Sequence, residues 1–166
     1  MTDAHWAMPF YTGKIVLVSG GTSGIGLGLA RGFAAAGAAV HATGATAGEV
    51  AAARGTAPEI SFSVLDVRDT AAVTAFAAQF QTVAALVNCA GVNLRAAEFT
   101  PEGFETVVDI NLTGTMRLCT ALRTQLHGGA VLNIASMFAF FGAGHAPAYA
   151  ASKGGVAQLT RSLAVA

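Results

Sequence analysis

The chain has little charge and little cysteine. Only 11% of its 166 residues are Asp, Glu, Lys or Arg, and nine basic residues balance nine acidic ones to a formal net charge of zero. A neutral chain gives no electrostatic reason to expect binding to nucleic acid or to an anionic membrane. The two cysteines, Cys89 and Cys119, lie in apolar stretches. This setting predicts buried free thiols in a reducing compartment such as the cytoplasm, not a disulfide.

Membrane spans, leader peptides and metal sites are not predicted. Residues 124–152 carry no formal charge, but their most apolar part, residues 130–144, falls short of the about 20 residues that span a bilayer. The first 13 residues lack the basic region and apolar core of a signal peptide. The four histidines show no metal-ligand spacing with one another or with the cysteines.

Apolar residues make up 54% of the chain, enough for one core and one domain. Apolar and β-branched runs predict strands at 15–19, 38–43, 60–65, 84–88 and 130–135. Helical periodicity and capping residues predict helices at 24–36, 46–54, 69–80, 101–124 and 147–166. Strands that alternate with helices predict a doubly wound, Rossmann-type α/β fold, with a parallel sheet and helices on both faces.

Two helix starts carry capping signals. Thr46-x-x-Glu49 is a capping box, and Gly55 is expected to end that short helix. Thr100 followed by Pro101 is typical of a cap and a first helical residue.

A glycine turn follows the first predicted strand. Its sequence, Gly20-Gly-Thr-Ser-Gly24-Ile-Gly26, leads directly into a helical pattern. Backbone N–H groups point out of a helix start, and glycines let a pyrophosphate approach the chain. The spacing is Gly-x-x-x-Gly-x-Gly, and an ordinary tight turn is the alternative. The strand–turn–helix setting favours a nucleotide site.

A Tyr and a Lys stand four residues apart in the last predicted helix, in Tyr149-Ala-Ala-Ser-Lys153, and Ser136 lies thirteen residues before the Tyr. Residues four apart share one face of a helix. An ammonium near a phenol favours its ionised form, and a Ser hydroxyl can hold the oxygen that is protonated. This set predicts general acid/base chemistry at a carbonyl or an alcohol, although Tyr-x-x-x-Lys also occurs by chance.

These motifs, taken in order along the chain, resemble those of the short-chain dehydrogenase/reductases. The matching pieces are Ser19–Gly26, Asp66-Val67, Asn88-Cys-Ala-Gly91, Asn111, Ser136 and the pair Tyr149/Lys153. The family usually has Thr where this chain has Ser19, and Asn where it has Cys89. The Cys89 side chain is expected to face the sheet. The resemblance implies a tail over residues 1–13 and a dinucleotide-binding domain over residues 14–166.

The resemblance also implies an NAD(P)-dependent oxidoreductase that moves a hydride between nicotinamide and a carbonyl or alcohol of a small molecule. The implied catalytic residues are Asn111, Ser136, Tyr149 and Lys153. The implied cofactor-binding residues are Gly20, Thr22, Ser23, Gly24, Ile25, Gly26, Asp66, Val67, Asn88, Ala90, Gly91, Tyr149 and Lys153. Tyr149 would transfer the proton, Lys153 would hold the ribose and favour the phenolate, Ser136 would position the substrate oxygen, and Asn111 would anchor a relay water.

Structural roles stay open for several of these residues. Asp66 can simply cap a helix, residues 88–91 can form an ordinary turn, and Ser136 can end its strand. Asn111 falls in mid-helix, where a bend or a buried hydrogen bond is the alternative to a relay.

The choice between NAD and NADP also stays open. An acid at the end of the second strand would bind the ribose 2′-hydroxyl and select NAD. Gly44, Ala45 and Thr46 occupy that corner, with neither an acid nor a base. Glu49 lies close by, but the capping box accounts for it.

The resemblance further implies two more strands beyond the last helix. The chain is therefore expected to be a fragment of a longer protein, or a short chain that a partner completes. Without those strands, the 130–135 strand would form an apolar, unprotected sheet edge. The helices at 101–124 and 147–166 are expected to pack against their copies in a homodimer or homotetramer. A non-catalytic dinucleotide-binding module is the alternative function.

Overall fold

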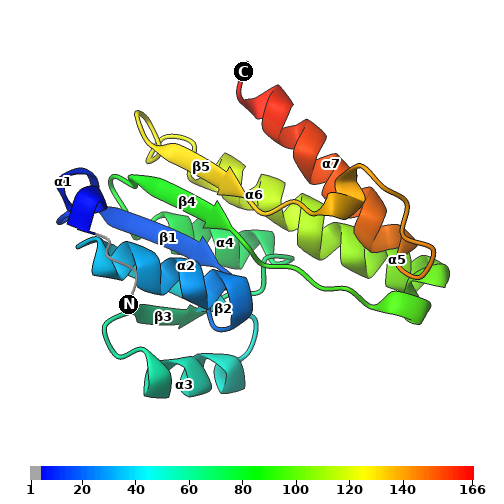
Figure 1. Ribbon diagram of the computed structural model, residues 1–166, viewed down its shortest axis with the longest axis horizontal. Coiled ribbons are helices and arrows are strands. Elements are labelled where there is room, and N and C mark those ends of the chain that lie inside the picture. Colours follow the sequence, from blue (N-terminus) through cyan, green and yellow to red (C-terminus); the bar gives the residue numbers. More distant parts are fainter. Residues whose placement is uncertain (1–4) are drawn as a thin grey trace.

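The computed structural model describes residues 5–166, so residues 1–4 of the predicted tail lie outside the described residues. The strands are β1 (Ile15–Ser19), β2 (Ala39–Gly44), β3 (Ser61–Val64), β4 (Ala85–Asn88) and β5 (Ala130–Asn133). The α-helices are α1 (Met8–Tyr11), α2 (Gly24–Ala35), α3 (Ala47–Thr56), α4 (Thr70–Ala77), α5 (Pro101–Val108), α6 (Gly114–Ala121) and α7 (Pro147–Leu163). Three short 3-10 helices, η1 (His5–Ala7), η2 (Arg95–Phe99) and η4 (Met137–Ala139), and one π-helix, η3 (Asp109–Thr113), complete the fold (Figure 1).

All five strands pair in parallel, in the order β3-β2-β1-β4-β5. Side chains alternate across the sheet and build a core on each face. Val16 and Val18 of β1 pack with Ala30 of α2 and Val50 of α3 on one face. Leu17 packs on the other face, in a cluster that includes residues of α4 and α6. The predicted doubly wound α/β fold is therefore confirmed.

The strand order reverses direction at β1. The chain moves from β1 outward through β2 to β3, and then returns to place β4 and β5 on the other side of β1. In such sheets the crossovers diverge between the carboxyl ends of the two central strands and leave a crevice there. Ser19 and Asn88 are paired in register at this point.

Each predicted strand is present, with ends that differ by at most two residues. Four helix predictions need correction at their C-terminal ends. The helix predicted over 69–80 ends at Ala77, and the helix predicted over 147–166 ends at Leu163. Gly55 lies within α3, which continues to Thr56 and ends just before Pro58, where the missing N–H stops the helix. The helix predicted over 101–124 is interrupted by the π-turn η3 and ends at Ala121, because residues 122–129 turn back toward β5.

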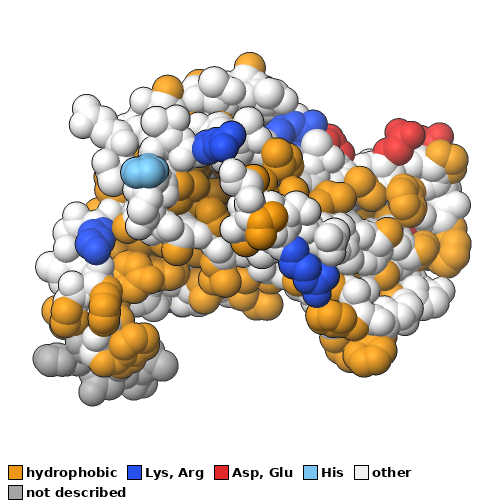
Figure 2. All heavy atoms as spheres, turned by 90° about the horizontal axis from the view of Figure 1, so that it is seen from above, with side chains coloured by type: hydrophobic (Ala, Val, Ile, Leu, Met, Phe, Trp, Pro, Cys, Tyr) orange, Lys and Arg blue, Asp and Glu red, His pale blue; other side chains and the backbone are white. Residues whose placement is uncertain are grey.

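Within residues 5–166, β5 forms one edge of the sheet and pairs only with β4. Its apolar side chains Val131 and Leu132 are 41% and 45% exposed. β5 and α7 lie uppermost in Figure 1, and the same face in Figure 2 shows broad hydrophobic surface with few charged side chains. The expected unprotected edge is therefore present. No helix in the described part of the chain has both the length and the apolar character needed to cross a membrane.

Candidate active site

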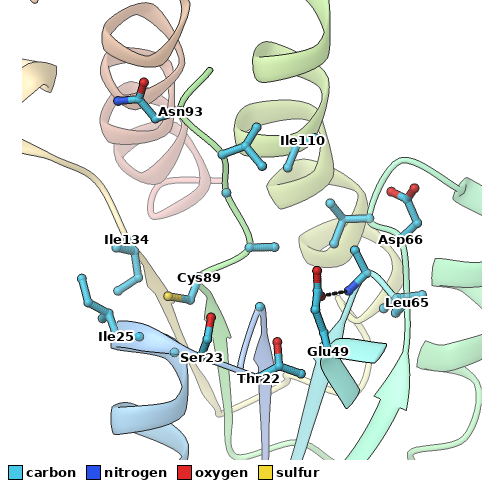
Figure 3. A pocket seen from close by; sticks show the side chains of 18 of the residues that line it. Thr22, Ser23, Ile25, Glu49, Leu65, Asp66, Cys89, Asn93, Ile110 and Ile134 are labelled. Carbon is cyan, nitrogen blue, oxygen red and sulfur yellow. Dashed lines mark hydrogen bonds between the residues drawn. The ribbon is translucent and has the colours of Figure 1, made fainter. Parts of the chain in front are cut away.

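A cleft of about 530 Å³ opens at the carboxyl ends of β1 and β4, where the strand order reverses (Figure 3). It lies within the size range of small-molecule sites. Most of the predicted site residues line it: Gly20, Thr22, Ser23, Gly24, Ile25, Gly26, Asp66, Val67, Ala90, Gly91, Tyr149 and Lys153. Three predicted residues, Asn88, Asn111 and Ser136, are not part of its wall.

The glycine turn forms one end of the cleft. Gly20 has a φ of +64°, and a Cβ there would lie 2.6 Å from the Cα of Ala90, so only glycine fits. A Cβ on Gly26 would collide with the main-chain carbonyl of Gly20. α2 begins at Gly24, and its N-cap residue Ser23 makes no side-chain capping bond. The first N–H groups of α2 are therefore left for an anion.

The residues present thus fit a dinucleotide phosphate at this end. A close-packed turn with several glycines leaves room for a pyrophosphate, and the start of α2 supplies donors and a favourable dipole.

Asp66 lies on the wall of the cleft beyond β3 and is paired with Arg68. Arg68 Nη2 lies 2.6 Å from Asp66 Oδ2, and its Nε donates to both carboxylate oxygens at 3.0 Å. The hydrogen bonds from Arg68 lower the pKa of Asp66, so this carboxyl is ionised across the neutral range. The pairing also neutralises the Arg68 cation at this end of the cleft.

Tyr149 and Lys153 share one face of α7, as predicted. The Lys153 Nζ lies 5.6 Å from the centroid of the Tyr149 ring. Lys153 is 5% exposed, and its Nζ donates to the main-chain oxygen of Ile134 at 2.6 Å. A buried ammonium therefore lies beside the phenol, held by a carbonyl that follows β5.

Cys89 lies in the same wall, contrary to the expectation that its side chain faces the sheet. Figure 3 shows it pointing into the cleft beside Ile134, because the chain leaves β4 at Asn88 and turns its next side chain toward the opening. Burial raises the pKa of Cys89, and the nearby Lys153 opposes that shift. Burial lowers the pKa of Lys153, and Cys89 opposes that shift in turn. Both described cysteines are free thiols, but only Cys119 is fully buried.

Asn111 does not line the cleft, but it is hydrogen-bonded to a segment that does. It lies in the π-turn η3 with 1% exposure. Its Oδ1 accepts from the Val92 N–H at 2.8 Å, and its Nδ2 donates to the Val92 carbonyl and to Ser152 Oγ, both at 3.0 Å. One side chain thereby joins the loop after β4 to α7. Both of its donor hydrogens are used in these bonds, which matches the buried-hydrogen-bond alternative.

Asn88 ends β4 but turns away from the cleft. Its Nδ2 donates to Asn133 Oδ1 at 2.8 Å and contacts Cys119 Sγ at 3.4 Å. These partners lie on β5 and α6, so the side chain ties the ends of two strands together.

Ser136 caps the short helix η4, and its Oγ accepts from the Phe138 N–H at 3.2 Å. Phe138 then meets the Tyr149 ring edge to face at 6.3 Å. Ser136 thus lies in the segment that packs against α7 near Tyr149, but it does not line the cleft itself.

Glu98 is a residue that the sequence did not reveal. Its carboxylate is 2% exposed and accepts three main-chain hydrogen bonds: from Leu94 at 2.9 Å, Arg95 at 3.2 Å and Tyr149 at 2.9 Å. The N-cap of α7, Ala146, offers no side-chain bond, so Glu98 caps that helix from 51 residues away. Nothing in the local sequence signals such a distant partner.

Several other cleft residues were not predicted: Ala45, Glu49, Leu65, Arg68, Cys89, Val92, Asn93, Ile110 and Ile134. Most are apolar, and no sequence pattern marks them. Glu49 did carry a signal, but the capping box gave it a local explanation.

A parallel sheet with a glycine turn at its reversal point defines a Rossmann-type dinucleotide-binding domain. Comparison with known proteins narrows this class. The sequence profile of the short chain dehydrogenase family matches residues 14–166. The chain therefore belongs to the short-chain dehydrogenase/reductase family, whose relatives use NAD or NADP.

Characterised relatives differ in their substrates. The chain is 34% identical over 165 residues to a D-threitol dehydrogenase of Mycolicibacterium smegmatis, covering 92% of this chain and 64% of the relative. It is 35% identical over 166 residues to a 3alpha-hydroxysteroid dehydrogenase of Mediterraneibacter gnavus, covering 91% and 66%. The chain thus spans just under two thirds of the length of these relatives.

Solved structures agree with the fold. The actinorhodin polyketide ketoreductase, solved with NADPH, superposes with a TM-score of 0.85 at 31% identity, over 91% of this chain and 64% of that one. The structure of gox2181 gives a TM-score of 0.88 at 29% identity, over 97% and 69%.

Proposed function

We propose that this chain carries the cofactor-binding and acid/base residues of an NAD(P)-dependent oxidoreductase acting on a carbonyl or alcohol carbon. The observation that carries the proposal is the cleft itself, whose wall contains both the glycine turn and the Tyr149–Lys153 pair. When bound, nicotinamide supplies or accepts the hydride. The substrate is a small molecule, and its identity is left unassigned.

The chain's own residues handle the proton. In reduction, Tyr149 gives its phenolic proton to the substrate oxygen, and in oxidation it takes that proton back. The Lys153 ammonium stabilises the phenolate that remains, and it would hold the ribose hydroxyls of a bound coenzyme. The role of Ser136 in positioning the substrate oxygen remains a prediction, since its Oγ accepts from the Phe138 N–H and Ser136 does not line the cleft. Asn111 keeps α7 in register with the loop after β4, and its predicted role in a water relay remains a prediction.

Replacing Tyr149 tests this assignment. Tyr149→Phe removes the proton donor but keeps the ring, so turnover of NADH or NADPH with a panel of ketones should fall by about 10²–10⁴-fold. Coenzyme binding, measured by fluorescence titration, should change little. Tyr11→Phe is the matched control, because Tyr11 packs on Phe33, away from the cleft. Turnover that survives in Tyr149→Phe would reject the acid/base role.

The alternative is a dinucleotide-binding module without catalysis. Tight coenzyme binding with no oxidation of NADH or NADPH by any substrate would support this alternative.

Two further features belong to the proposal. Homo-oligomers would form through α5, α6 and α7, where Phe104 and Met116 are 41% and 39% exposed. A cytoplasmic location agrees with the two free thiols. Sedimentation velocity and fractionation of the source cells test these points.

A further inference from the structure

The end of β2 lacks a side chain, but it does not lack an acid. Gly44 ends the strand, and a Cβ built on it would lie 3.0 Å from Glu49 Oε2 and 3.0 Å from Thr22 Oγ1. The space that a side chain at position 44 would enter is therefore filled by Thr22, whose Cγ2 would lie 2.6 Å from that Cβ, together with the carboxylate of Glu49 from the first turn of α3. Because Gly44 is small, an acid from the next helix reaches the end of the second strand.

Capping explains only part of this position. Thr46 Oγ1 accepts from the Glu49 N–H at 3.2 Å, as the capping box predicts. The return bond differs, since Glu49 Oε2 accepts from the Ala45 N–H at 2.8 Å, one residue before the N-cap. This bond draws the carboxylate over the strand end and into the wall of the cleft. Figure 3 shows Glu49 there, between Thr22 and Leu65.

The charges around the end of β2 do not favour binding of a phosphate group beside the Glu49 carboxylate. Among the residues described as lining the cleft, the cations are Arg68 and Lys153. Arg68 is engaged by Asp66, and Lys153 donates to the Ile134 carbonyl beside Tyr149. A phosphate next to Thr22 and Gly44 would therefore meet the Glu49 carboxylate without a free cation from this wall.

We propose that Glu49 selects the coenzyme. Its carboxylate accepts a hydrogen bond from the adenosine ribose 2′-hydroxyl and repels a 2′-phosphate, so the chain prefers NAD(H) to NADP(H). The selecting acid stands on α3 and not at the strand end, where the sequence shows only Gly44 and Ala45. This inference rests on the proposed function, because it requires a dinucleotide in the cleft.

Binding of two probes that lack nicotinamide tests the proposal. Isothermal titration of the whole chain should give ADP-ribose an affinity at least about tenfold higher than that of ADP-ribose 2′-phosphate at low salt. Added NaCl should narrow this ratio, because salt screens the repulsion. Glu49→Gln keeps the shape and removes the charge, so the ratio should fall by about tenfold. Glu59→Gln is the matched control, since Glu59 is exposed, precedes β3 and does not line the cleft.

The outcomes separate this inference from the proposed function. Equal affinities, a preference for the 2′-phosphate, or an unchanged ratio in a folded Glu49→Gln protein would overturn the role of Glu49 and leave the proposed function intact. If neither probe nor NADH binds the wild-type chain, both the role of Glu49 and the proposed function are rejected. The wild-type ratio tests the predicted preference even where the variant fails to fold.

Discussion

Glu98 is a carboxylate that main-chain N–H groups solvate in place of water. Its three bonds join the loop after β4 to the first turn of α7, and one of them ends on the Tyr149 N–H. A fully hydrogen-bonded buried polar group makes the surrounding structure rigid. Removing the Glu98 carboxylate would leave the three buried N–H groups without an acceptor. The position of the proposed proton donor thus depends on a residue that does not line the cleft.

Replacing Glu98 should cost stability. Glu98→Gln keeps the volume but turns one acceptor into a donor that faces an N–H group, so we expect a loss of about 2 kcal/mol in the free energy of unfolding. Urea denaturation measures this change. Glu105→Ala, on the exposed face of α5, should alter stability by less than about 0.5 kcal/mol. Equal stability of Glu98→Gln and the wild type would contradict the capping role.

Cys89 offers a reporter of the cleft. Because burial raises its pKa, its thiolate fraction near neutral pH is small, and alkylation by iodoacetamide should be slow there. The alkylation rate should keep rising above pH 9, because the ordinary pKa of a thiol is 9.0 and burial raises the pKa of Cys89. Bound NADH should protect Cys89, since the side chain lines the cleft, and peptide mass mapping measures the modification. Fast, unprotected labelling at pH 7 would show that the thiol is not in this environment.

At the scale of elements, the turn from β1 into α2 depends on close main-chain packing. Gly26→Ala should disrupt this turn, because the new methyl group meets the Gly20 carbonyl. We expect the variant to lose the thermal stabilisation that NADH gives the wild type, about 2.7 kcal/mol at one hundred times the dissociation constant. Differential scanning fluorimetry measures this effect.

Gly28→Ala is the control on the same helix. A methyl group there meets no atom within 4 Å, so the change should stabilise α2 by about 0.5–1 kcal/mol and leave the NADH effect intact. A normal NADH response in Gly26→Ala would argue against the turn as the phosphate site.

The π-helix η3 is the second element whose geometry shapes the cleft, because it sets the position of Asn111. One extra residue per turn at Asp109–Thr113 places the Asn111 side chain where it reaches both Val92 and Ser152. Single π-helical turns inside α-helices frequently occur at functional sites. Here the turn connects α5 and α6 to the cleft through a single amide.

At the scale of the whole molecule, the sheet ends in an open, apolar strand. No strand in the described part of the chain pairs with the outer side of β5, which exposes Val131 and Leu132. Edges of this kind pair with other chains. We expect concentration-dependent self-association, which Leu132→Lys should reduce without a loss of thermal stability.

Light scattering after size exclusion measures that association. Val165→Lys introduces the same charge at a residue that is 88% exposed and lies outside the sheet, so it should have a smaller effect. A wild-type chain that stays monomeric at every concentration would contradict the prediction.

The sequence alone determined the fold class, the strands and the ends of the cleft. Apolar runs, a glycine turn and the Tyr149–Lys153 spacing are local patterns, because strand burial, φ > 0 and helical periodicity act over a few residues. The exposed edge at β5 was predicted from the family resemblance and not from these local patterns.

Tertiary structure decided which side chains meet across the chain. Three hydrogen bonds show this, because each joins residues far apart in sequence. They link Tyr149 to Glu98, Asn111 to Ser152, and Asn88 to Asn133. Glu49 shows that the sequence is limited at short range too. The sequence predicted its part in the capping box, but not that its carboxylate points into the cleft wall. Burial and hydrogen-bond direction depend on how elements pack, and no single segment of the sequence contains that information.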